Sequence, residues 1–325
     1  MASAMASLPR VTIITPFLNA EAFLGEAISS VQAQTVADWE LLLVDDGSTD
    51  DSVRIANDVV ATDPRIKVLN RPPGSKRGAA AARNAGIAAG SGDMLAFLDA
   101  DDLYEPRMLE TVLAAADANP EAAMIFGPTR WWYPDGERPD WIEPTDGLAG
   151  RLHQPPHLLS RLLLMQDGHV PCTCSVLVRR SAIELVAGFE EQFRLYEDQV
   201  LWVKLLLRYP AYVTPICLSR YRQHSGSVSA DAAKRGLYDG MGSHPARAPF
   251  LDWLAEYVVK SGVRNPKLDR AIRLARSPYT REPTLRNKAD RLSLKAAMRL
   301  ARLRHRFARK LARLYRLMNG TASRS

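Results

Sequence analysis

The stretch GDMLAFLDADDLY, residues 92–104, joins a run of apolar residues to three carboxylates within four positions. The apolar part, 94–98, has the length and composition of a buried β-strand, and Asp99, Asp101 and Asp102 follow it directly. Carboxylates this close together repel one another unless a cation or ligand neutralises them. Their oxygen atoms suit Mg²⁺ or Mn²⁺, which stabilises a departing diphosphate, so the pattern predicts a divalent metal site. Asp-x-Asp alone is a weak pattern, and an exposed acidic turn or a helix N-cap is the alternative.

The same alternation of apolar strands and helical patterns runs through the first 120 residues. Apolar runs at 11–14, 41–44 and 66–69 predict three further strands, the first ending at Thr15 and Pro16. Continuous apolar strands between helices are typical of a parallel sheet that is covered on both faces. Ligands bind such sheets at the carboxyl ends of the strands. The polar residues expected at these ends are Thr15, Asp45, Asp46, Asp99 and Asp101.

Helices are predicted between and after these strands. Ser48 or Thr49 is the expected N-cap of the second helix, and the alanine-rich stretch 79–89 is expected to form the third. Residues 129–170 are rich in Trp, Pro, Asp and Gly and predict long loops with little regular structure. The other expected elements are a helix at about 106–118, a strand at 175–178, a helix at 196–209 and one or two strands within 212–221.

A second polar segment, VDDGSTD at 44–50, follows the second predicted strand. The Asp46 carboxylate has the chemistry to accept a hydrogen bond from the imide N–H of uracil or thymine, and Gly47 permits the sharp turn. Helix capping by the hydroxyl and acidic residues of this segment is a compatible alternative. Arg77 and Arg83 place cations near the same edge, within reach of phosphate oxygens, although most surface cations are simply solvated.

Taken in order, these motifs resemble those of the family-2 glycosyltransferases with the GT-A fold. The resemblance covers about residues 8–230 and implies an α/β architecture, in which helices flank a Rossmann-like, mostly parallel central sheet. The matching segments are VTIITPFLN (11–19), DWELLLVDDGSTD (38–50), ARNAG (82–86), GDMLAFLDADDLY (92–104), Gly188-Phe189 with Glu197-Asp198, and YRQHSGSVS (221–229).

The resemblance also implies a role for individual residues. The nucleotide and donor site would contain Thr15, Pro16, Asn19, Asp46, Arg77, Arg83 and Asp99. The metal ligands would be Asp101, Asp99 and His224. Asp198, with Glu197 beside it, would be the general base that deprotonates the acceptor hydroxyl. A lone histidine is more often structural than a ligand, which is the alternative for His224.

These roles amount to a single displacement with inversion at the anomeric carbon. Asp198 begins an apolar helix, and a helix N-terminus favours a carboxylate that stays ionised. Capping of that helix by Glu197 and Asp198 is the alternative. The stretch 170–174 lies where the family has a donor-facing loop, and here it contains Cys172 and Cys174. The donor sugar therefore stays open, with a UDP- or dTDP-sugar expected.

The net charge of +7 is concentrated at the C-terminus. Residues 281–325 contain 14 Lys and Arg and 2 acidic residues, which leaves 29 basic and 34 acidic residues in 1–280. Apolar residues recur at spacings of three and four along 281–318, which predicts a basic amphipathic helix on an anionic membrane surface. Packing on the chain's own domain and pairing as a coiled coil are alternatives. Nucleic-acid binding is disfavoured because the helix has few aromatic residues.

The expected organisation is a GT-A domain at 1–230, a helical linker region at 231–280 and the basic tail at 281–325. Within the first domain, about 8–120 would bind the nucleotide and about 121–230 the acceptor. No signal peptide or apolar run of about 18 residues occurs, and three cysteines make no disulfide framework. We expect a cytoplasmic protein, peripheral on the inner membrane, that acts on a glycan or lipid-linked acceptor; a homo-oligomer is left open.

Three other classes of function fit parts of the sequence. A dinucleotide-dependent oxidoreductase needs a glycine-rich turn after the first strand, but residues 15–19 contain no glycine. A nucleotidyltransferase of similar fold usually has a glycine-rich basic loop at the same place. A catalytically inactive glycan- or membrane-binding module has no use for the acidic residues that this chain carries at each position the chemistry requires.

Overall fold

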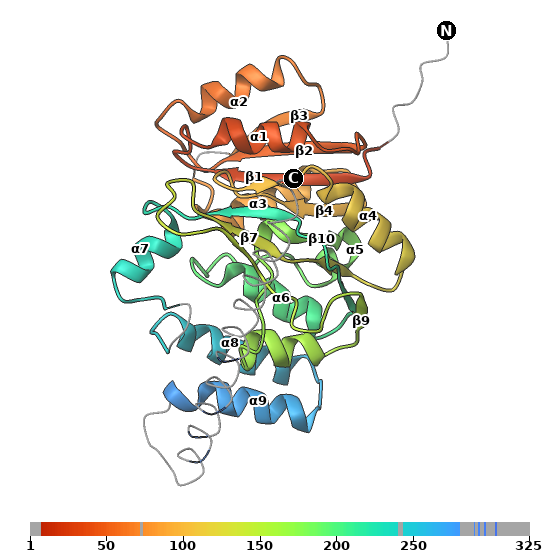
Figure 1. The fold of residues 1–325 in the computed structure, drawn as a ribbon, viewed down its shortest axis with the longest axis vertical. Helices are drawn as coiled ribbons and strands as arrows, with labels where there is room; N and C mark the ends of the chain where they lie inside the picture. Colours follow the sequence, from red (N-terminus) through yellow and green to blue (C-terminus); the bar gives the residue numbers. More distant parts are fainter. Residues whose placement is uncertain are drawn as a thin grey trace, which may run out of the picture.

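The computed structural model describes residues 8–71, 74–239 and 243–279, together with Ala289, Leu292, Ala296 and Leu303. Helices α1 (Leu24–Gln32) and α2 (Ser52–Val60) lie at one end of the long axis, and α8 (Arg247–Lys260) and α9 (Pro266–Arg276) lie at the other (Figure 1). The other α-helices are α3 (Ala79–Ala89), α4 (Met108–Ala118), α5 (Arg180–Leu185), α6 (Glu197–Leu206) and α7 (Val228–Lys234). Short π- or 3₁₀-helical segments are η1 (Leu159–Leu164), η2 (Thr173–Ser175) and η3 (Ser277–Tyr279).

Two sheets form the centre of the fold. Their strands are β1 (Val11–Phe17), β2 (Trp39–Asp45), β3 (Ile66–Asn70), β4 (Met94–Phe97), β5 (Leu103–Tyr104), β6 (Met124–Phe126), β7 (Thr129–Trp132), β8 (Trp141–Ile142), β9 (Arg151–His153), β10 (Val176–Arg179), β11 (Ala211–Val213) and β12 (Ser219–Arg222). The larger sheet has the order β3-β2-β1-β4-β10-β6-β11-β9, and the smaller has the order β5-β12-β7-β8. β1 to β4 are parallel, whereas β10 and β9 run antiparallel to their neighbours. The predicted α/β fold with a mostly parallel sheet is confirmed.

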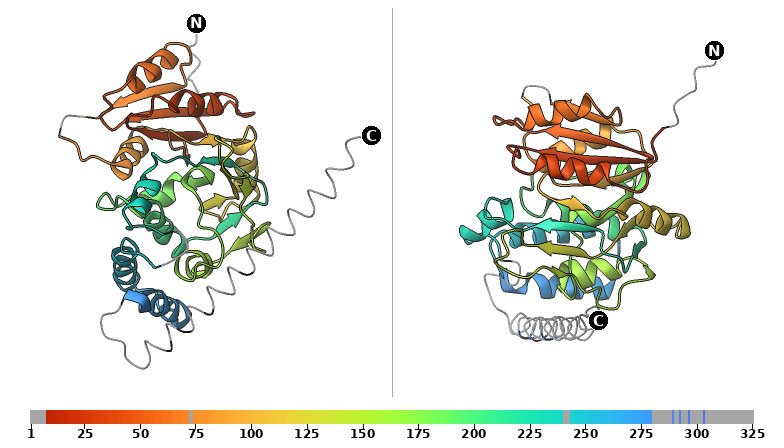
Figure 2. Two further views of the ribbon diagram at one scale, coloured as in Figure 1. Left: turned by 60° about the vertical axis from the view of Figure 1, so that its left-hand side comes forward. Right: turned by 45° about the horizontal axis from the view of Figure 1, so that its top comes forward.

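Side chains of the large sheet enter two apolar layers. Ile14 and Phe97 join a core cluster with residues of α3, α6, α8 and α9, whereas Ile13 joins another with residues of α1 and α4. Since successive strand residues point to opposite faces, the sheet is covered on both. The region 231–280, predicted as a helical linker, contributes Phe250 to the first cluster. Figure 2 shows from two further sides that α8 and α9 cover the end of the fold opposite β2 and β3.

The first strand is longer than the sequence predicted. β1 runs through Pro16 to Phe17, whereas the apolar pattern placed its end at Thr15 and Pro16. Proline lacks the N–H that a central strand donates to its neighbour. Pro16 is tolerated because the pairing of β1 with β4 stops at Ile14, while residues 15–17 pair with β2. Residues 15–17 of β1 therefore have no paired strand on the side of the loop that follows β4.

The predicted N-cap of the second helix was wrong. α2 begins at Ser52, and Ser48 and Thr49 lie in the loop before it. The Ser48 hydroxyl accepts a hydrogen bond from the Asn19 N–H at 3.1 Å, and the Asn19 side chain accepts one from the Thr49 N–H at 2.8 Å. These polar groups therefore join the loops after β1 and β2 instead of capping the helix.

Residues 129–170 contain more regular structure than their composition predicted. β7, β8 and β9 contain four, two and three residues. Strands this short leave no readable periodicity in the sequence, which explains the wrong prediction of loops. β7 pairs with β12, and β9 adds an edge to the large sheet beside β11. The segment η1 buries four leucines beneath α9.

Replacing Gly92 with Ala is expected to destabilise the fold by about 1–3 kcal/mol because the added methyl overpacks the sheet. A Cβ at Gly92 would lie 2.6 Å from the Thr12 backbone nitrogen and 2.7 Å from the Val11 carbonyl carbon, and this backbone cannot yield cheaply. Urea unfolding measures the change. Gly25→Ala is the control: a Cβ there meets nothing within 4 Å in helix α1, so unchanged or higher stability is expected. Equal stability of the two variants would contradict the prediction.

Candidate active site

The carboxyl ends of β1, β2 and β4 meet at one edge of the sheet. The Asp46 N–H donates to the Phe17 carbonyl at 2.9 Å, and the Leu98 N–H donates to the Ile14 carbonyl at 3.1 Å. These bonds attach the loops after β2 and β4 to the two sides of β1. Thr15 lies between them, and its buried hydroxyl has no hydrogen-bond partner among the described residues. A ligand would satisfy this hydroxyl, so Thr15 suits the pocket for which it was predicted.

Arg83 joins the two acidic motifs of the sequence. Its side chain, on α3, is 3% exposed, and its guanidinium donates to Asp99 at 2.5 Å and to Glu197 at 3.2 Å. Burial by itself lowers the pKa of Arg83, but the negative charges of Asp99 and Glu197 outweigh it and raise the pKa. Arg83 was predicted to reach over the surface toward phosphate oxygens. In the structure it is buried and binds two carboxylates, which brings residues 99 and 197 to one place.

Glu197 and Asp198 form the first turn of α6, as the sequence predicted. Burial raises the pKa of Asp198 to about 7, and the charge of Glu197 acts in the same direction. Hydrogen bonding from the Gln199 N–H and the charge of Arg83 oppose this rise. The expectation that the helix N-terminus keeps Asp198 ionised is corrected, because burial and a neighbouring acid are stronger. A carboxyl that titrates near neutral pH is well matched to proton transfer.

Asp101 and His224 form the second polar pair of the site. The Asp101 Oδ2 and His224 Nε2 atoms are 2.9 Å apart, and the His224 ring packs on Phe23 with centroids 4.8 Å apart. Within the described ranges, no three His, Cys, Asp or Glu side chains converge as a complete metal site. Mg²⁺ and Mn²⁺ commonly use one or two protein ligands and take the rest from phosphates and water. The pair Asp101 and His224 fits an ion of that kind.

The third aspartate of the motif has a different environment. Asp102 is 1% exposed and accepts a hydrogen bond from the Arg222 N–H at 2.9 Å. Burial, followed by the charges of Asp101 and Asp99, raises the pKa of Asp102 well above its usual range. The Arg222 side chain donates to the Asp101 carbonyl at 2.7 Å. These contacts attach β12, and with it His224, to the loop that carries Asp101.

Asp46 is held by basic and backbone groups. Its carboxylate pairs with Arg71 and accepts a hydrogen bond from the Gly78 N–H at 2.8 Å. Arg77 donates to the Asp46 carbonyl instead of facing open solvent. Gly47 has a φ of +99°, which confirms the predicted need for glycine at this turn. The carboxylate predicted to bind a base already has partners, which a nucleoside would replace or share.

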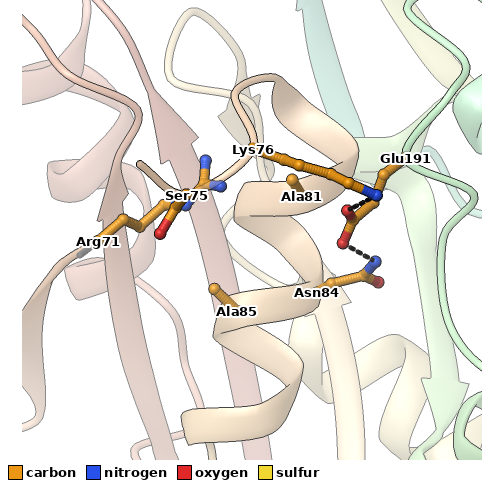
Figure 3. Close-up of a pocket in the computed structure, with 7 residues that line it drawn as sticks. All are labelled: Arg71, Ser75, Lys76, Ala81, Asn84, Ala85 and Glu191. Atoms are coloured by element: carbon orange, nitrogen blue, oxygen red, sulfur yellow. Dashed lines mark hydrogen bonds and ion pairs between the residues drawn. The ribbon is translucent and has the colours of Figure 1, made fainter. Parts of the chain in front are cut away.

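A hollow of about 500 Å³, shown in Figure 3, is lined by Arg71, the partner of the Asp46 carboxylate. Arg71 lines one side, and Lys76, Glu191 and Asn84 line the other, with the Lys76 amine 3.3 Å from Glu191. Arg71 was not predicted from the sequence because an arginine after a strand is common. Its place directly after β3, at the same edge as Asp46, is the signal that identifies it.

The predicted residues thus fall into three groups. Asp99, Arg83 and Glu197-Asp198 are joined through Arg83, while Asp101 pairs with His224. Asp46, with Arg77, lies at the end of β2. Asn19 bonds to the loop after β2, and Pro16 lies within β1. The donor, metal and catalytic roles of all these residues stay predictions.

The family model described as Glycosyl transferase family 2 matches residues 12–186, more than half of the chain. The chain belongs to glycosyl transferase family 2. This match contains the end of β1, Asp46, Arg83 and the acidic loop after β4. It ends before α6, so Asp198 and His224 lie outside the matched residues.

Known proteins agree with this family. The UDP-Glc:alpha-D-GlcNAc-diphosphoundecaprenol beta-1,3-glucosyltransferase WfgD of Escherichia coli is 31% identical over 69% of this chain and 81% of its own length. The structure of S. aureus TarS 1–349 in complex with UDP-GlcNAc superposes with a TM-score of 0.63 at 15% identity and covers 90% of this chain and 81% of that one. The mannosyltransferase PcManGT from Pyrobaculum calidifontis, in complex with GDP-Man and Mn²⁺, gives 0.53 at 17% identity over 92% and 88%.

Other relatives are covered over a smaller share of their own length. Four curated proteins, among them glycosyltransferases and an O-antigen biosynthesis protein, are covered over only 13–42% of their length. The two solved structures share fewer than one residue in five with this chain and establish the GT-A fold. The predicted family and fold are confirmed.

Proposed function

We propose that this chain moves a sugar from a nucleoside-diphosphate donor to a hydroxyl of a glycan or lipid-linked acceptor, with inversion. The observation that carries the proposal is the convergence of two acidic motifs on the buried Arg83. Asp99 marks the donor side of this group and Glu197-Asp198 the acceptor side. A displacement reaction needs a leaving-group site and a base close together, and this arrangement supplies both.

Each side chain of the site has a task in this reaction. Asp101 and His224, with Asp99 nearby in sequence, are the candidate ligands for Mn²⁺ or Mg²⁺. Such an ion, when bound, neutralises the diphosphate and makes it a better leaving group. Asp198 takes the proton from the acceptor hydroxyl, and its pKa of about 7 suits that step. Arg83 holds Asp99 in place and lowers the cost of the buried charge on Glu197.

We propose further that the donor is a UDP- or dTDP-sugar. The name of the E. coli relative mentions UDP-Glc, and the S. aureus structure is a complex with UDP-GlcNAc. Both support a UDP donor here. In this proposal the unpaired Thr15 hydroxyl and the Asp46 carboxylate are the groups that the nucleoside binds. The archaeal structure with GDP-Man and Mn²⁺ supports use of a divalent ion by this fold.

Incubation with a panel of radiolabelled UDP-, dTDP- and GDP-sugars and Mn²⁺ tests the proposal. Slow release of free sugar from one donor is expected without any acceptor, and EDTA should stop it. Asp101→Asn is expected to lower this hydrolysis by about 100-fold, since one charged stabiliser of the leaving group is lost. Asp58→Asn, on the exposed face of α2, is the matched control and should have no effect.

Two outcomes of this experiment favour the rival functions. When nucleoside triphosphates are added to the panel, release of inorganic pyrophosphate with no sugar release would identify a nucleotidyltransferase. Donor binding without turnover of any donor would identify an inactive binding module. Full hydrolysis by Asp101→Asn would remove Asp101 from the metal site.

The basic tail gives a separate proposal about location. Of the predicted helix at 281–318, the structure describes Ala289, Leu292, Ala296 and Leu303, each helical and exposed; the rest lies outside the described residues. No helix in the described ranges is both long and apolar enough to cross a bilayer. We propose that the tail attaches the protein to the cytoplasmic face of the inner membrane, since each cation near an anionic surface contributes about 1 kcal/mol.

Ending the chain after Tyr279 is expected to abolish co-sedimentation with anionic vesicles and to leave donor binding unchanged. Phosphatidylcholine vesicles are the control, because the attraction is electrostatic and should be absent there. Light scattering of the full and the shortened chain tests the coiled-coil alternative. If the tail pairs two copies as a coiled coil, its removal should halve the mass. Undiminished sedimentation of the shortened chain would contradict membrane binding by the tail.

A further inference from the structure

The residue before the two acidic residues of α6 has an unusual backbone. Tyr196 is the N-cap of α6 and has φ 72° and ψ 9°, in the left-handed region. Bulky L-residues adopt this conformation only where their surroundings hold it. No side chain caps the helix at this position, although Ser, Thr, Asp or Asn usually does so. Something else must fix the first turn, which carries Glu197 and Asp198.

The groups that hold Tyr196 come from the C-terminal part of the described chain. Its ring stacks on Phe250 of α8, with centroids 4.8 Å apart and planes at 15°. It also lies nearly parallel to the His244 ring, at 5.9 Å and 16°. The Tyr196 hydroxyl is 2.6 Å from His244 Nε2. Both Tyr196 and His244 are buried, so this hydrogen bond is protected from water.

His244 is itself fixed by its neighbours. The Tyr238 ring lies 5.0 Å from the His244 ring, and the backbone N–H of His244 donates to the Tyr279 hydroxyl at 3.2 Å. Arg247, at the start of α8, is buried and donates to the carbonyl oxygens of Leu163 and Leu164 at 2.9 and 3.1 Å. The segment 243–279 is therefore attached to the core independently of Tyr196, and it can act as a support for it.

We propose that His244 and Tyr196 are positioning residues for the catalytic carboxyl. The stacked tyrosine, fixed by its hydrogen bond to His244, sets the backbone from which Glu197 meets Arg83 and Asp198 meets the acceptor. This inference rests on the proposed function, since it takes Asp198 as the base. The residues concerned all lie beyond the segment 12–186 that the family model matches. The support is thus built from a part of the chain that the family pattern does not describe.

Three variants test the inference through donor hydrolysis, measured well below the lowest Tm. His244→Ala is expected to lower kcat by about 10- to 100-fold, because a shift of about 1 Å in a reacting group costs that much. The KM for the donor should stay within about twofold, since no donor-side residue is touched. Tyr196→Phe keeps the stacking and loses the hydrogen bond, so a smaller loss of kcat is expected. His244→Gln, whose amide can reach the position of Nε2, should recover most of the rate.

Leu268→Ala in α9 is the matched control. Leu268 is fully buried in the same core cluster as Phe250 and Tyr196, so the variant loses stability. The hydrogen bond and the ring stacking of Tyr196 involve His244 and Phe250, and the variant leaves both side chains in place. It should show a lower Tm and an unchanged kcat. Wild-type kcat in both His244→Ala and Tyr196→Phe would reduce the pair to a structural role and overturn the inference. Should His244→Ala fail to fold, Tyr196→Phe decides alone, because it removes one oxygen atom.

Asp198→Asn separates this inference from the function on which it rests. An inactive Asp198→Asn with fully active His244 and Tyr196 variants defeats the positioning role and leaves the proposed function intact. A fully active Asp198→Asn defeats the assignment of the base, and the positioning role with it. An inactive Asp198→Asn together with a reduced kcat in His244→Ala and recovery in His244→Gln supports both.

Discussion

Replacing Asp198 with Asn is expected to lower sugar transfer and donor hydrolysis by about 10³-fold while the protein stays folded, because general-base catalysis contributes about that much. Asn has nearly the same shape as Asp, and its amide oxygen can accept the hydrogen bond from the Gln199 N–H. It does not take up a proton at neutral pH. The KM for the donor should change little, since Asp198 lies on the acceptor side. Near-normal turnover would remove Asp198 from its role.

The same variant should also change how stability depends on pH. The pKa of Asp198 is raised from its ordinary 3.8 to about 7, mainly by burial. Between pH 3.8 and about 7, the Asp198 carboxyl keeps its proton in the folded protein and loses it in the unfolded chain. The stabilisation from this group is therefore complete below about pH 4 and is lost as the pH rises through about 7. Since Asn stays neutral, Asp198→Asn should have a higher Tm than the wild type at pH 8.5.

A pH series separates this effect from general packing changes. The Tm difference between Asp198→Asn and the wild type should be positive at pH 8.5, smaller at pH 5 and close to zero below about pH 4. Wild-type activity should rise with pH through about 7, as the base loses its proton. Asp58→Asn, in an exposed ion pair, should follow the wild type in both measurements. A pH-independent Tm difference would mean that Asp198 is not the group that titrates.

Elements with long apolar runs were predictable from the sequence. The strands that became β2, β3 and β4 and the helix at 79–89 match their predictions to within a residue or two, because several apolar side chains in sequence leave a readable period. The short strands β7, β8 and β9 leave none. Pro16 also showed the limit of a local rule, since proline ends a strand only where its missing N–H is needed.

The site was predictable as a set of residues and not as a set of contacts. Motif order indicated that Asp99, Asp101 and Asp198 belong together. Nothing local indicates that Arg83 pairs with Glu197, because the pairing depends on how the fold brings α3 to the first turn of α6. The ionisation of Asp198 was mispredicted for the same reason. A helix N-terminus is visible in sequence, whereas burial of the first turn is a property of the fold.

Replacing Arg83 with Met is expected to destabilise the protein by about 3 kcal/mol, because it leaves two partly buried carboxylates without a counter-charge. The figure is at the lower end of the usual range, since the Asp99 and Glu197 side chains keep 32% and 18% exposure. Urea unfolding at pH 8 measures it. Arg54→Met is the control. Arg54 pairs with two exposed aspartates, Asp51 before α2 and Asp58 within it, and a change within about 0.5 kcal/mol is expected.

Restoring neutrality should separate the electrostatic role of Arg83 from its packing. Arg83→Met combined with Asp99→Asn and Glu197→Gln removes the unpaired charges and is expected to recover most of the lost stability. Activity should not return, because the guanidinium that holds the donor-side and acceptor-side acids together is still missing. Arg83→Lys keeps the charge, but a single ammonium does not span two carboxylates as the guanidinium does, so its activity should remain low. Full activity in the lysine variant would mean that positive charge alone, and not the bridge between the two motifs, is what the site requires.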